Sequence, residues 1–155
     1  MSPVTGSSFT YVTFIRTTPE KLWSALTDVN QMKEYWFGMH ITTEWKAGAE
    51  WQMVFPDGRV ADTGEILELE RPKRIRLKWR NEFRPELKAE GFALCTMDLA
   101  PVGAAVRLTI THTIERAGSK FIEAVSGGWP KVLSNLKSLL ETGQVVLTER
   151  DHSHE

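Results

Sequence analysis

A histidine on a predicted strand, His112, is the side chain best suited to acid–base chemistry. In the segment 104–115 it shares one face with Leu108 and Ile110, while threonines alternate on the other face. This period of two places the imidazole on the covered side of a sheet. An imidazole with an ordinary pKa near 6.5 can act as a general base, and it can equally orient a ligand or fill a core position.

The single cysteine, Cys95, raises the question of a nucleophile beside that histidine. It shares one strand face with Ala93 and Met97, and a simple hairpin turn at 101–104 would bring it beside Ile110 and near His112. A cysteine–histidine pair can form a covalent intermediate. The sequence offers no third group to orient the histidine, so a small buried apolar cysteine is the preferred interpretation.

A carboxylate, Glu65, also falls on a predicted inner face. It has the same parity as Leu67 and Leu69 and would lie opposite Trp79 across the hairpin at Pro72. A buried carboxylate must be paired or become neutral. Two readings stay open: the side chain holds a ligand hydroxyl, or it lies at the rim of the sheet in water.

Aromatic residues form the strongest constellation, because six tryptophans occur in 155 residues. Trp51 and Phe55 alternate with polar residues on one strand, Trp79 lies on an inner strand face, and Trp129 lies on the helix that should cover the sheet. Rings at these positions either fill a core or line a cavity with a few polar contacts. The predicted ligand-binding set is Trp36, Trp51, Met53, Phe55, Glu65, Trp79, His112 and Trp129.

The elements that would position these residues follow a simple order. Phe9 to Arg16 has strand composition, Thr18-Pro19 opens a helix, and a second short helix ends near Trp36. Six further strand segments follow, separated by turns containing Gly or Pro. Their ranges are 39–45, 49–55, 61–70, 74–81, 88–100 and 104–115.

The last predicted element is a long helix, 119–142, whose apolar residues recur every three or four positions. It is the candidate cover for the apolar face of the sheet, with Ser119 and Gly143 as its caps. Gly127 to Pro130 interrupts the pattern, so we expect a kink or a break there. The segment 144–155 is expected to be a frayed tail.

Bulk properties indicate one domain, 1–155, with its core in 9–143. The net charge of −1 gives no reason to expect nucleic-acid or membrane binding. The start of the chain lacks a signal pattern, and one cysteine excludes an internal disulfide, so a cytoplasmic location is expected. His152 and His154 lack the spacing and further ligands of a metal site, so no metal and no cofactor are predicted.

A row of basic residues on one strand resembles a surface that binds nucleic acid. Arg74, Arg76, Lys78 and Arg80 share a face, but Glu68 and Glu70 on the neighbouring strand can pair with them across the sheet. The row is therefore interpreted as a solvated outer face.

The order of elements and several strings together resemble the superfamily of lipid-transfer START domains, birch-pollen-allergen-like proteins and polyketide cyclases. Within it, the chain is similar to the branch named after activators of the heat-shock protein 90 ATPase. The matching strings are 19–28, the pair Tyr35-Trp36, 64–72, 77–79, 128–133 and 140–143, so the resemblance covers roughly 9–143. It implies an α+β helix-grip fold: a curved antiparallel sheet of about seven strands around a long C-terminal helix, with two short helices after the first strand. It also implies a cavity with Trp36 at its mouth, and no common catalytic motif.

The function predicted from these features is binding of a small hydrophobic or amphipathic molecule, such as a lipid, in an internal cavity. One alternative is a cyclase or hydratase in which His112 or Glu65 moves a proton. A second is a co-chaperone-like module with a role in the stress response, acting on a protein partner through its surface. Whether the chain is an enzyme, and its oligomeric state, stay open at this point.

Overall fold

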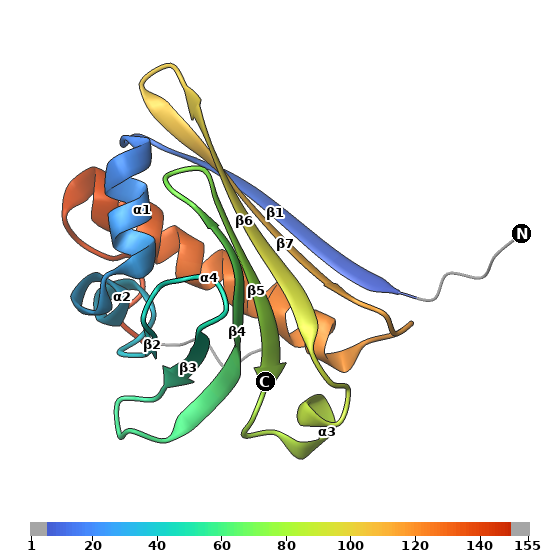
Figure 1. Ribbon diagram of the computed structural model, residues 1–155. Coiled ribbons are helices and arrows are strands. Elements are labelled where there is room, and N and C mark those ends of the chain that lie inside the picture. Colours follow the sequence, from blue (N-terminus) through green and yellow to red (C-terminus); the bar gives the residue numbers. More distant parts are fainter. Residues whose placement is uncertain (1–5, 150–155) are drawn as a thin grey trace, which may run out of the picture.

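The computed structural model describes residues 6–149 and shows an α+β fold of seven strands and four helices over that range (Figure 1). The long helix α4 (Lys120–Thr142) lies across one face of the sheet, and the short helices α1 (Pro19–Thr27) and α2 (Val29–Tyr35) follow the first strand. The strands are β1 (Ser7–Ile15), β2 (His40–Thr42), β3 (Glu50–Val54), β4 (Val60–Glu70), β5 (Arg74–Asn81), β6 (Ala93–Val102) and β7 (Ala105–Ile114).

The sheet is antiparallel throughout, with the order β1-β7-β6-β5-β4-β3-β2. Consecutive strands are neighbours from β2 to β7, and β1 closes the other end by pairing with β7. This arrangement confirms the predicted seven-stranded sheet with a covering C-terminal helix. Strands that alternate between apolar and polar residues are suited to it, because one face is buried and the other is wet.

The inner and outer faces follow the predicted alternation. Ile75, Leu77 and Trp79 are buried on β5, whereas the basic residues between them lie on the outer face. Arg76 pairs with Glu68 (3.8 Å), as the register of β4 and β5 allows, and Arg74 pairs with Asp98 on β6 (2.7 Å). The outer basic row is therefore partly neutralised by carboxylates on both neighbouring strands.

Two local expectations about the strands were wrong. Residues Pro85–Lys88 form a short helix, α3, so β6 begins at Ala93 instead of at 88. The β6–β7 hairpin turns at 103–104, which places Cys95 directly opposite His112 and Met97 opposite Ile110. The tighter turn extends β6 to Val102 and shifts the register by two residues.

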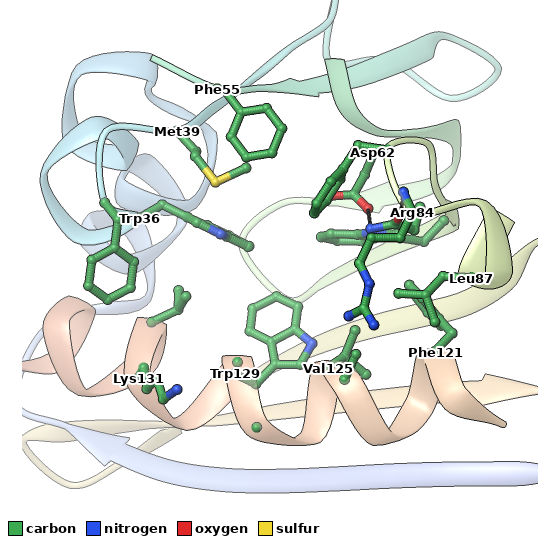
Figure 2. A pocket seen from close by; sticks show the side chains of 18 of the residues that line it. Trp36, Met39, Phe55, Asp62, Arg84, Leu87, Phe121, Val125, Trp129 and Lys131 are labelled. Carbon is green, nitrogen blue, oxygen red and sulfur yellow. Dashed lines mark hydrogen bonds between the residues drawn. The ribbon is translucent and has the colours of Figure 1, made fainter. Parts of the chain in front are cut away.

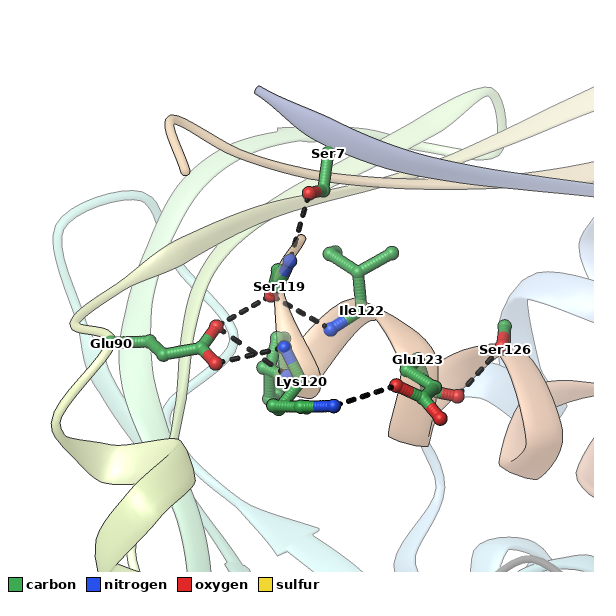
Figure 3. Close-up of polar contacts among 8 residues, drawn as sticks. Ser7, Glu90, Ser119, Lys120, Ile122, Glu123 and Ser126 are labelled. Atoms are coloured by element: carbon green, nitrogen blue, oxygen red, sulfur yellow. Dashed lines mark hydrogen bonds and ion pairs between the residues drawn. The ribbon is translucent and has the colours of Figure 1, made fainter. Parts of the chain in front are cut away.

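The N-terminus of α4 is fixed by side chains from two distant parts of the chain (Figure 3). Ser119 accepts a hydrogen bond from the Ile122 amide (3.0 Å), as expected for an N-cap. Glu90, between α3 and β6, accepts from the Ser119 hydroxyl (2.5 Å) and from the Lys120 amide (2.9 Å). A carboxylate at this end also interacts favourably with the positive pole of the helix dipole. Ser7 of β1 accepts from the Ser119 amide (3.1 Å).

Helix α4 runs without a break through Gly127, Gly128 and Pro130 to its C-cap at Gly143. The expected break is therefore absent. Proline removes one helical hydrogen bond, but the helix is buried on both sides of the interruption, and this packing holds its two halves together. The buried residues of α4 are Phe121, Ile122, Trp129, Val132, Leu133, Asn135 and Leu136.

The segment after α4 is also more ordered than expected as far as residue 149. The buried amide of Asn135 donates to the Leu147 carbonyl (2.9 Å) and accepts from the Val146 and Leu147 amides (3.1 and 2.7 Å). An amide side chain offers a donor and an acceptor side by side, so it can pair with a peptide unit as a neighbouring strand would. Residues 144–149 are thus held against α4, and the rest of the predicted tail lies outside the described residues.

Candidate functional site

A cavity of about 620 Å³ opens between helix α4 and the end of the sheet formed by β3, β4 and β5 (Figure 2). Its volume is within the range of small-molecule sites. The segment after α2 forms one wall, the β3–β4 hairpin another, and the corner after β5 a third. The lining residues are Trp36, Phe37, Met39, Phe55, Arg59, Asp62, Trp79, Asn81, Phe83, Arg84, Leu87, Phe121, Ala124, Val125, Gly127, Gly128, Trp129, Lys131 and Val132.

Three tryptophans in mutual contact line this cavity. Ring centroids of Trp36 and Trp129 are 5.2 Å apart, those of Trp79 and Trp129 5.9 Å, and those of Trp36 and Trp79 6.3 Å. Trp36 is the C-cap of α2, Trp79 lies on β5 and Trp129 on α4, and each is at least nine-tenths buried. Mostly edge-to-face contacts of this kind fix the rings relative to one another. Together with Phe55, they are the predicted site residues that the structure brings to the cavity.

His112 lies one layer beneath that surface and does not line the cavity. Its ring is fully buried and packs against the rings of Trp79 (5.2 Å), Phe121 (5.5 Å) and Trp129 (5.9 Å). The indole Nε1 of Trp129 donates to His112 Nδ1 (3.1 Å), and Nε2 has no hydrogen-bond partner among the described residues. Burial lowers the pKa of His112 to about 3. The ring is therefore neutral, and its visible role is to orient Trp129.

Trp51 and Met53 lie deeper in the core, on β3. The Trp51 indole crosses Gly64 of β4 and donates to the Lys78 carbonyl on β5 (3.0 Å). A Cβ at Gly64 would lie 1.7 Å from that carbonyl oxygen and 2.6 Å from the indole nitrogen, so only glycine fits there. The ring then supports Trp79 from behind, with centroids 4.8 Å apart.

Glu65 faces the outer side of the sheet, contrary to the expectation that it lies opposite Trp79. Its Cα partner on β5 is Lys78, and Gly64 is the residue opposite Trp79. The cause is a bulge at Leu67, where Ile66 pairs with Leu77 but Glu68 already pairs with Arg76. One extra residue reverses the inward and outward parity between Glu65 and Leu69, so counting alternate positions gives the wrong face for Glu65.

Burial also affects Cys95. The thiol is fully buried opposite His112, and burial raises its pKa above the ordinary value. A protonated buried thiol behaves as a small apolar side chain.

Several lining residues were not identified from the sequence. Gly127 and Gly128 present no side chain to the cavity, and a Cβ at Gly128 would meet nothing within 4 Å. The glycine pair was interpreted only as a helix interruption, although it also leaves space beside Trp129. Phe37 follows α2 with a left-handed backbone (φ 54°), a strained conformation that often occurs at binding sites. No periodic pattern marks Phe37 or Arg84.

Asp62, Asn81 and Arg84 gather at one corner of the cavity, whereas Lys131 lies on α4 at the other end (Figure 2). Asn81, which is 7% exposed, donates to Asp62 (3.2 Å) and accepts from the Arg84 amide (2.9 Å). This pair of bonds fixes the corner from which the Arg84 side chain projects. Arg59 lies over the Phe55 ring at 4.9 Å and donates to Asp57 (2.8 Å).

Within residues 6–149, no group of three or more potential metal-binding side chains occurs, and His152 and His154 lie outside that range. Nor does any helix in this range have the length and hydropathy needed to cross a membrane.

Comparison with known protein families identifies the family to which this domain belongs. The family described as "Activator of Hsp90 ATPase homolog 1-like protein" matches residues 16–141, which is most of the chain. The chain belongs to this family. No curated protein is significantly similar to the chain in sequence.

Solved structures agree with the AHSA1-like assignment. The domain matches protein MLL2253 from Mesorhizobium loti with a TM-score of 0.76 and 21% identity, over 90% of this chain and 100% of the other. It matches the Aha1 dimer from Colwellia psychrerythraea (0.72, 19%, 88% and 98%) and the HSP90 activator PFC0360w from Plasmodium falciparum (0.70, 22%, 86% and 95%). At these identities the likeness of the AHSA1-like domain to them concerns the fold alone.

Proposed function

We propose that this AHSA1-like domain binds a small hydrophobic or amphipathic molecule in the cavity between α4 and the sheet. The observation that carries the proposal is the cavity itself: about 620 Å³, walled by Trp36, Trp79 and Trp129 and widened by the absence of side chains at Gly127 and Gly128. Apolar surface with a few polar groups is the usual composition of a ligand site.

The two side chains considered for proton transfer give the enzyme alternative little support. His112 is covered by Trp129 and the neighbouring rings, and Glu65 is on the outer face of β4. A general base must come within hydrogen-bond reach of the proton that it removes. Neither side chain reaches a molecule held in the cavity, whereas binding requires only shape and orienting contacts.

The test is to fill the cavity from Gly128. In Gly128→Phe the new ring projects into open space, and replacing a helical glycine adds no strain to α4. An apolar fluorescent probe, N-phenyl-1-naphthylamine, should bind the wild type with a stoichiometry near one and quench tryptophan emission. The variant should unfold at the same or a higher denaturant concentration and lose most of the probe binding.

The matched control is Ser134→Phe, which adds the same ring to an exposed position of the same helix. It should leave probe binding unchanged. If no probe binds the wild type, or if Gly128→Phe and Ser134→Phe bind it equally well, the cavity is not a binding site.

The family name favours a second candidate, a partner-binding role with an Hsp90-type chaperone. The outer face carries an exposed aromatic ring, Phe92, with Lys78 Nζ at 5.3 Å and Arg80 at 4.6 Å from its centroid. Aromatic and arginine side chains are enriched at interfaces. Phe92→Ala should then abolish any stimulation of the chaperone ATPase rate by the wild type. An unchanged ATPase rate on adding the wild type contradicts this role.

A further inference from the structure

We infer that the ligand carries one anionic group, which Arg84 receives at the polar side of the cavity. The inference rests on the proposed binding function and adds the chemical class: an amphiphile with an apolar body and a single carboxylate, sulfonate or similar anion. It begins from the charges at the cavity, which include three cations, Arg59, Arg84 and Lys131, and one carboxylate, Asp62.

Arg84 is the cation best placed for this role. Its side chain extends from the corner after β5 toward Phe121 and Val125 on α4, across the end of the cavity (Figure 2). Its Nε donates to Glu86 (2.9 Å), and its two terminal Nη groups donate to none of the described residues. A guanidinium has five donors, so these groups can bind both oxygens of an anion at once.

The backbone that carries Arg84 is already rigid. The Arg84 amide donates to Asn81 Oδ1 (2.9 Å), and Asn81 Nδ2 donates to Asp62 (3.2 Å). The Asp62 carboxylate therefore accepts a hydrogen bond from Asn81, and this bond lessens its repulsion of an anion in the cavity. Such a preorganised corner reduces the entropy that binding must overcome.

The rest of the cavity suits the apolar part of the molecule. Trp36 and Trp129, in contact at 5.2 Å, wall the part of the cavity away from Arg84, and Val125 lies between Trp129 and Arg84 (Figure 2). Apart from Lys131, the lining around Trp36 and Trp129 is apolar, so a second polar end of the molecule would lie mainly against rings with few hydrogen-bond partners. One charged end and one apolar body is the complementary arrangement.

The experiment uses two probes with the same ring system. 1-Anilinonaphthalene-8-sulfonate carries an anion, and N-phenyl-1-naphthylamine lacks it. Arg84→Met should weaken binding of the sulfonate about tenfold, on the scale of a charge-assisted hydrogen bond, and leave binding of the neutral probe unchanged. Arg76→Met removes the same charge from the outer face and should change neither. Dodecanoate and dodecanol, used as competitors of the neutral probe, should show the same contrast.

The outcomes separate the two proposals. If both probes bind the wild type but Arg84→Met affects them equally, the anionic class is overturned and the binding function stands. If neither probe binds, the binding function itself fails. Added salt gives a check that needs no variant: it should weaken binding of the sulfonate to the wild type and not binding of the neutral probe.

Discussion

Burial, and not a charged partner, determines the behaviour of His112. Desolvation lowers its pKa to about 3, and its Nδ1 already accepts a hydrogen bond from Trp129. Protonation would place an unpaired charge in the core and would break that bond. The histidine is therefore a fixed neutral acceptor beneath the cavity, and its removal acts on Trp129 first.

Because the folded pKa lies below the ordinary value near 6.5, the unfolded state binds more protons between pH 6.5 and 3. Stability should accordingly fall as the pH falls, by up to about 1.4 kcal/mol per pH unit from this group alone. His112→Gln keeps an acceptor without titrating. Its free energy of unfolding, measured by denaturant titration between pH 6.5 and 5, should depend less on pH than that of the wild type.

The matched control is His40→Gln. Burial, together with the nearby Lys33 charge, also lowers the pKa of His40, but that residue is only half-buried and should account for less of the slope. Equal slopes for the wild type and His112→Gln would show that His112 titrates normally.

For single residues, the sequence predicted well on which face of the sheet a side chain lies, and poorly which other side chains it contacts. Alternation placed His112 and Trp79 on one inner face, because a period of two follows from strand geometry. It failed at Glu65, since a bulge adds one residue without any mark in the local composition. It also could not show that His112 is covered by Trp129, because that contact depends on how α4 sits on the sheet.

At the scale of elements, Pro130 is the residue whose effect differs most from expectation. It lies inside α4, where it leaves the Ser126 carbonyl without its helical donor. The helix nevertheless continues, so packing of Trp129, Val132 and Leu133 outweighs the local cost. The caps and apolar period predicted the two ends of α4 correctly, because both are local signals, whereas continuity is decided by tertiary contacts.

Pro130→Ala should restore the missing hydrogen bond and raise the free energy of unfolding by about 1–3 kcal/mol. Denaturant titration measures the gain. Affinity for the neutral naphthylamine probe should stay the same, because Pro130 does not line the cavity. A less stable variant would mean that the proline ring itself packs in a way that alanine cannot replace.

At the scale of the whole molecule, the stability of the sheet depends on helix α4, which covers its apolar face. A chain ending at residue 118 lacks α4 and would leave the inner faces of β5, β6 and β7 exposed to water. Such a large apolar surface cannot be retained by a folded domain. This truncation should therefore show no cooperative unfolding transition, and a well-folded truncated domain would contradict the architecture.

A chain ending at Gly143 is the informative comparison, because it retains α4 and loses the segment that Asn135 binds. It should unfold cooperatively with a loss of about 2–3 kcal/mol, on the scale of three hydrogen bonds. The two truncations separate the role of the helix as a cover from the role of the segment after it.

The contacts among Trp36, Trp51, Trp79 and Trp129 have an optical consequence. Rings 4.8 to 6.3 Å apart at fixed angles couple their electronic transitions, so the cluster should give a strong circular dichroism band in the near ultraviolet. That band reports the packing of four different elements at once. It should disappear when tertiary packing is lost even if the far-ultraviolet signal of the helices and strands persists. The tryptophans thus make the tightness of this core directly visible in the unlabelled protein.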